Sequence, residues 1–135
     1  MSRNIQDIEG IGPKYAEMLK QQGIDTTDKL LEVGADRSGR KELAEKTSIK
    51  ESYLLKWVNM CDLFRIKGVA GQYAELLEGA GVDTVKELRI RNADNLALQM
   101  SEVNDAKRLC KTNPSSKTVA EWIRQARELE PKVTH

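Results

Sequence analysis

The chain has 135 residues, 39% hydrophobic and 32% charged, enough for a modest core in one domain or two very small ones. Its 22 basic and 21 acidic residues nearly cancel, so the net charge does not indicate a nucleic-acid partner as a strongly basic domain would. No apolar run reaches the length of a membrane span and no signal-peptide core is present, so we expect a cytoplasmic protein without a membrane partner.

Residues that usually carry catalysis or bind metals are scarce. The only histidine is His135, and Cys61 and Cys110 form neither a metal-binding pattern nor a disulfide framework. Both cysteines fall in helical apolar patterns, which predicts buried, reduced thiols. No cluster of carboxylates stands out for holding metal ions, so we expect no enzyme, no metal, no cofactor and no small-molecule substrate.

The first feature along the chain is the segment Ile8-Glu9-Gly10-Ile11-Gly12-Pro13-Lys14. Gly10 suits the left-handed end of a short helix, and Pro13 suits the first position of the next helix, where its missing N–H costs nothing. We call residues 10–14 the first hairpin and expect the following helix over residues 13–22. The helix start offers backbone N–H groups with little side-chain cover, which suits a phosphate.

Helix caps and apolar spacing divide the rest of the first half into three helices. Asp25 or Thr26 caps a short helix, Asp36 caps a basic amphipathic helix, and the last helix runs from Glu51 to about Cys61. The segment 43–54 also resembles a helix-turn-helix. However, the apolar faces of the last helix leave few polar side chains to read bases, so we favour a structural role.

The opening stretch recurs in the second half of the chain. A shift of 58 residues aligns residues 4–36 with residues 62–94 without a gap, and a shift of 65 aligns Trp57 with Trp122. The second half therefore carries seven more residues (65 minus 58), most simply placed in the region of residues 111–116. We infer two units, 1–61 and 62–135, in one shared compact fold with approximate two-fold pseudo-symmetry.

The second half is expected to repeat the order of helices. Asp62 caps a short helix to Lys67, Thr84 has capping-box spacing, and further helices follow Asp94 and either Ser115 or Ser116. No segment shows the alternation of a strand, so the predicted fold class is all-α, with tandem units.

Residues 68–72, the second hairpin, depart from the first. Ala70-Gly71-Gln72 stands where the first hairpin has Gly12-Pro13-Lys14, so the second glycine, the helix-starting proline and the lysine are all lost. These changes favour a packing role for the second hairpin.

The first hairpin fits the apolar-x-Gly-apolar-Gly pattern of the helix-hairpin-helix motif found in sequence-tolerant DNA-binding proteins. A helix-helix corner that merely turns the chain gives the same short pattern. Basic clusters elsewhere are usually solvated helix faces, although they can also contact phosphates. The candidate DNA phosphate contacts are Gly10, Ile11, Gly12 and Lys14, with Gly68, Gly71, Arg40, Lys41, Lys107, Arg108 and Lys111 as possible secondary contacts.

The chain as a whole resembles a family of small uncharacterised bacterial proteins, a domain of unknown function with duplicated helix-hairpin-helix units. The residues that carry the resemblance are 10–16, 39–47, 56–59 and 65–68. The resemblance covers nearly all of residues 5–129 and implies the fold. It implies a function only through the hairpin motif, and Ala70 departs from the expected pattern, which weakens the case for a phosphate contact there.

Two functions of different classes follow. The first is a non-enzymatic, sequence-tolerant DNA-binding module that contacts backbone phosphate through the first hairpin. The alternative is a protein-protein interaction or scaffolding module that keeps the fold without binding DNA. The intact first hairpin favours DNA as partner, whereas the nearly neutral charge favours a protein partner.

Overall fold

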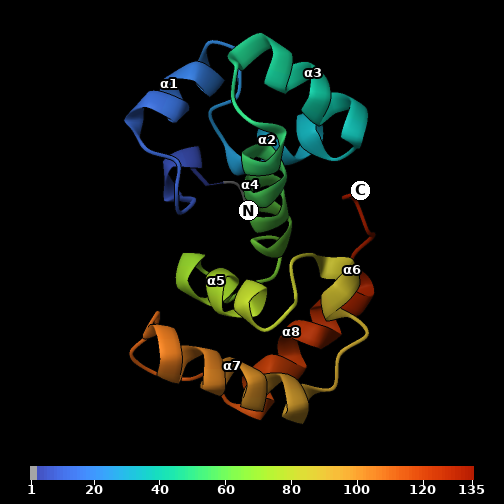
Figure 1. Cartoon of the computed structure of the whole chain (residues 1–135). Coiled ribbons are helices and arrows are strands. Elements are labelled where there is room, and N and C mark those ends of the chain that lie inside the picture. The colour runs from blue at the N-terminus through green and yellow to red at the C-terminus, as the bar shows by residue number, and fades with distance from the viewer. Residues whose placement is uncertain (1–2) are drawn as a thin grey trace. The chain divides into compact units, whose positions relative to one another are not determined.

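The structure is a computed structural model that describes residues 3–135 (Figure 1). Over these residues the chain forms helices joined by turns and no β-strand, so the predicted all-α class is confirmed. One isolated antiparallel bridge joins Asn4 to Thr26. The residues group into two compact units, Met1–Asp62 with Lys132–His135, and Leu63–Pro131. The shared fold and the pseudo-symmetry stay predictions.

Local capping explains where the helices of the first unit begin. The Thr26 hydroxyl accepts the Lys29 N–H at 3.3 Å, and the Asp36 carboxylate accepts the Gly39 N–H at 2.7 Å, as the sequence predicts. The elements of this unit are η1 (Ile5–Asp7), α1 (Pro13–Lys20), α2 (Thr27–Gly34), α3 (Arg37–Thr47) and α4 (Glu51–Leu63), whose last residue falls in the second unit.

Close packing of α2 gives the first unit its core. The helix α2 packs against α3. A Cβ atom on Gly34 would lie only 2.5 Å from Cγ2 of Val58, so a glycine at the end of α2 allows close approach to α4. The buried side chains include Leu30, Leu43 and Trp57.

The C-terminal segment of the chain belongs to the first unit. The Thr134 N–H donates to the Ala35 carbonyl at 2.8 Å, and Val133 is buried. Arg40 completes the attachment, because its guanidinium donates to the carbonyls of Gly34 at 2.8 Å, Ala35 at 3.1 Å and Thr134 at 2.6 Å. Burial lowers the pKa of Arg40, although the charges of Asp36 and Glu51 oppose that shift.

The second unit is built around α7. This helix packs against both α8 and α5, and α6 packs against α8 (Figure 1). Thr84 and Ser115 cap helices as the sequence predicts, whereas α7 is capped by Asn92 and begins before Asp94. The helices of this unit are α5 (Gly71–Gly79), α6 (Val85–Leu88), α7 (Ala93–Lys107) and α8 (Ser116–Glu128).

The predicted short helix from Asp62 to Lys67 is wrong. α4 runs on to Leu63, and turns follow it. The Lys67 N–H donates at 2.8 Å to Oε1 of Gln125, and the Gln125 amide donates back to the Lys67 carbonyl at 3.2 Å. A partner 58 residues away therefore takes the backbone groups that a local helix would use.

The predicted burial of the two thiols holds only for Cys61. Both cysteines are free, and Cys61 is buried on α4. Cys110 is half-buried, because α7 ends at Lys107 and leaves Cys110 in a loop rather than on an apolar helix face. Arg108 ends the helix in the left-handed conformation, with φ of 53°.

Candidate functional site

The backbone of the first hairpin turns at Gly10. Gly10 has φ of +94°, a conformation that favours glycine. The Ile11 N–H then donates to the Ile8 carbonyl at 3.1 Å, and the buried Ile11 side chain anchors the turn. Gly12 is the N-cap of α1 with φ of −81° and ψ of −179°, and Pro13 takes the first position of the helix.

The exposed tip of the first hairpin has unused donors. Over residues 3–135, the N–H groups of Gly12, Lys14 and Tyr15 have no hydrogen-bond partner, as expected for the first turn of a helix without a side-chain cap. No heavy atom lies within 4 Å of the position that a Cβ on Gly12 would take. Lys14 is exposed and has no ion pair within the same residues. This arrangement suits an anion.

Aromatic side chains support the first hairpin from the core side. The Tyr15 ring packs against the Trp57 ring with 5.2 Å between centroids, and against the Tyr53 ring at 6.3 Å. Nε1 of Trp57 lies 3.4 Å from the Cβ position of Gly10. Trp57 is buried, so it positions the hairpin on α4 and does not offer a surface for stacking bases.

The second hairpin repeats this local structure with different residues at its tip. Gly68 has φ of +95°, its Cβ position lies 3.1 Å from Nε1 of Trp122, and Tyr73 packs on Trp122 at 5.3 Å. Ala70 is the N-cap of α5 with φ of −96° and ψ of 177°. Ala70 and Gln72 therefore occupy the positions of Gly12 and Lys14 in nearly the same backbone.

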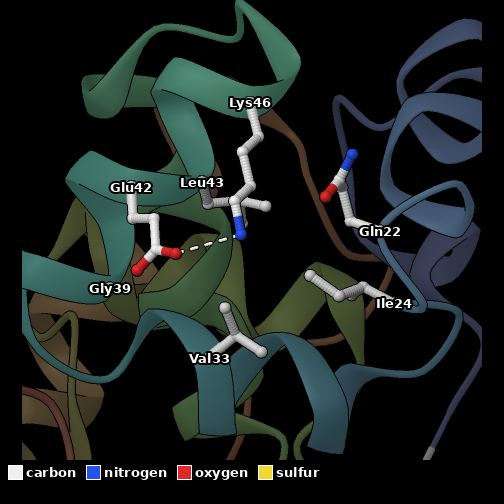
Figure 2. Close-up of a pocket in the computed structure, with 7 residues that line it drawn as sticks. All are labelled: Gln22, Ile24, Val33, Gly39, Glu42, Leu43 and Lys46. Carbon is white, nitrogen blue, oxygen red and sulfur yellow. Dashed lines mark ion pairs between the residues drawn. The ribbon is translucent and has the colours of Figure 1, made fainter.

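The basic residues of α3 do not form one exposed cluster. Arg40 is 4% exposed and its guanidinium donates to three carbonyl groups, so, contrary to the prediction, it is not available to a DNA phosphate. Lys46 pairs with Glu42 at 3.0 Å beside a pocket of about 250 Å³, and Figure 2 shows its amino group directed at that carboxylate. Lys41 is exposed and keeps its place among the candidates.

The basic residues at the end of α7 separate into two groups. Lys107 lines a groove of about 380 Å³ that also contains Gly79 from α5. Arg108 and Lys111 line a different cavity, of about 630 Å³, next to Ala70 of the second hairpin. Spacing in the sequence could not show this division, because it depends on where the chain leaves α7.

The described part of the chain contains neither a metal-binding cluster nor a membrane-spanning helix. Among residues 3–135, no three His, Cys, Asp or Glu side chains are grouped so that they could hold a metal ion. None of the helices formed by these residues combines the length and the apolar character needed to cross a membrane.

Comparison with known proteins identifies a protein family. A family described as Domain of unknown function (DUF4332) matches residues 9–129, a span that includes both hairpins and the helices α1 to α8 but not η1. No curated protein and no solved structure matches the chain.

Proposed function

Because the chain belongs to the DUF4332 family of domains of unknown function, we propose its function from its own geometry: a non-enzymatic, sequence-tolerant DNA-binding module. The first hairpin contacts a backbone phosphate, and the two units are duplicated helix-hairpin-helix units. DNA is the partner, and the module needs no cofactor for this binding.

The observation that carries the proposal is the open tip of the first hairpin. The backbone N–H groups of Gly12, Lys14 and Tyr15 have no hydrogen-bond partner within residues 3–135. The side chain of Lys14 is exposed and has no ion pair within the same residues. A helix N-terminus favours negative charge, and the lysine adds a full positive charge to it. A phosphate oxygen can approach Gly12 closely, since no side chain covers it.

The chemistry of the hairpin predicts binding that tolerates any sequence. Backbone N–H groups and a lysine contact phosphate, and phosphate contacts position a protein on DNA without reading its bases. Leu54 of the helix-turn-helix-like segment and Trp57, further along α4, are buried, so neither side chain is available to a DNA groove.

Lys14→Ala tests the proposal in a titration of duplex DNA at several salt concentrations. We expect weaker binding to every sequence and a log–log salt slope smaller by about one unit, because one phosphate contact is lost. Gln72→Ala is the matched control at the same position of the second hairpin and should leave the slope unchanged. Equal affinities and equal slopes for Lys14→Ala and its parent would reject the hairpin as the DNA contact.

The alternative, a protein-interaction module, is supported by a different observation. Ile90 and Leu98 of the second unit are 73% and 62% exposed, so both offer apolar surface to a protein partner. A parent protein that does not bind DNA even at low salt would favour this alternative.

A further inference from the structure

A cavity lies beside the second hairpin. It lies between the start of α5 and the segment 108–115, which we call the α7–α8 loop. Its volume is about 630 Å³. Its polar lining includes Gln72 and Tyr73 of α5 and Arg108, Lys111 and Thr112 of the loop.

The charge on this cavity has one sign. Arg108 and Lys111 are both exposed, neither has an ion pair within residues 3–135, and no acidic residue is among those that line the cavity. Glu75 is not among the lining residues, but its charge affects Cys110. Burial is the larger cause that raises the pKa of the Cys110 thiol, and the charge of Glu75 is the smaller one. Arg108 and Lys111 of the loop thus place positive charge next to the second hairpin, which has Gln72 where the first hairpin has a lysine.

Asn104 fixes the loop that carries these cations. Its buried side-chain amide donates to the Cys110 carbonyl at 3.0 Å and to Oδ1 of Asn113 at 2.8 Å, and its oxygen accepts the Cys110 N–H at 2.9 Å. Asn113 is held in turn by Ser101 at 3.2 Å. Arg108 and Lys111 therefore extend from a backbone that is ordered before any ligand arrives, which lowers the entropic cost of binding.

We propose that this cavity binds a phosphate group. Arg108 supplies a planar fork of donors and Lys111 a compact charge, the two side chains that proteins use most for phosphate. Gln72 and Thr112 add neutral donors at the same cavity. The volume of about 630 Å³ leaves room for a phosphate linked to a sugar. The phosphate belongs either to the DNA backbone, which rests on the proposed function, or to a free phosphate compound.

The test follows the amide signals of Gln72, Tyr73 and Thr112 by NMR in the full chain. One titration uses inorganic phosphate, another uses a short DNA duplex at low salt, and sodium chloride at matched ionic strength is the control. We expect these signals to shift with phosphate and with DNA. Signals of Lys14 and Tyr15 report on the first hairpin in the same spectra.

Two substitutions remove the cations without removing the loop. Lys111→Ala should weaken binding at the cavity about tenfold, as expected for a lost charge-assisted contact. Arg108→Asn should do the same, since asparagine tolerates the left-handed backbone at this position. Lys117→Ala is the matched control, because Lys117 is also an exposed lysine after the loop but is not among the cavity-lining residues.

The outcomes separate the cavity from the first hairpin. Shifts with both ligands support the cavity and assign the DNA backbone as its source of phosphate. Shifts with inorganic phosphate alone support the cavity and assign a free phosphate compound. If DNA shifts only the Lys14 and Tyr15 signals, and phosphate shifts nothing at the cavity, the cavity proposal is overturned while the proposed function stands. Unchanged binding at the cavity in Lys111→Ala and Arg108→Asn would also overturn it.

Discussion

The two hairpins differ mainly at their tips. Gly10 and Gly68 share a positive φ, of 94° and 95°, and each lies against the indole of a buried tryptophan. The next N-cap positions share an extended backbone, yet one is Gly12 and the other Ala70. The local fold therefore needs glycine at the position of Gly10 and Gly68, and tolerates a side chain at the position of Gly12 and Ala70.

Gly10 and Gly12 differ in whether the backbone conformation requires a glycine. At Gly10 the backbone conformation accounts for the residue, so no ligand is required to explain it. At Gly12 a φ of −81° suits any residue, and a Cβ would meet no atom within 4 Å. Glycine at this position is best explained by an approach from outside the chain, and that is the argument for a phosphate at the first hairpin.

Valine substitutions should separate the two glycines most strongly. Gly10→Val should lower the free energy of unfolding by about 2–3 kcal/mol, because a β-branched residue is strained at φ of +94°. Gly68→Val should cost at least as much, since its Cβ would lie 3.1 Å from Trp122. Gly12→Val should cost under about 1 kcal/mol, the modest penalty of a poorer N-cap. Urea denaturation followed by circular dichroism checks all three, and equal losses at Gly10 and Gly12 would contradict the comparison.

A smaller effect is expected where the first unit holds the C-terminal segment. Arg40→Met removes the donor to three carbonyls and should lower the free energy of unfolding by about 2 kcal/mol. Lys41→Met is the control, an exposed neighbour on the same helix that should change stability by about 0.5 kcal/mol or less. A destabilisation at Lys41 as large as that at Arg40 would show that the charge of α3, and not the carbonyl contacts, matters.

The smallest expected effect is a difference in thiol reactivity between Cys61 of the first unit and Cys110 of the second. Burial raises the pKa of the Cys61 thiol far above its usual range, and the charges of Asp28 and Asp62 add to the shift. Cys61 should therefore react with a thiol reagent only when the protein opens, whereas half-buried Cys110 should react in the folded protein, more slowly than a free thiol. Mass spectrometry of partly labelled protein identifies the site, and faster labelling of Cys61 would contradict the assignment.

Interactions between residues close in the sequence could be predicted, whereas interactions between distant residues could not. The caps Thr26, Asp36 and Thr84 were predictable because each bonds an N–H three residues on. Arg40 was misplaced among the exposed cations because Thr134, one of its partners, lies 94 residues away. The position of the α7–α8 loop was equally hidden, since it depends on how the single side chain of Asn104 satisfies Cys110 and Asn113.

The central claim is that Gly12 leaves room for a phosphate, and the affinity of Gly12→Val for duplex DNA tests it most directly. The variant should unfold at nearly the same urea concentration as the parent and bind DNA at least about tenfold more weakly at low salt, because its side chain blocks the N–H groups of the helix start. Gly12→Ala, which copies Ala70, should fall between the two. If folded Gly12→Val binds DNA as tightly as the parent, the first hairpin is not the DNA contact.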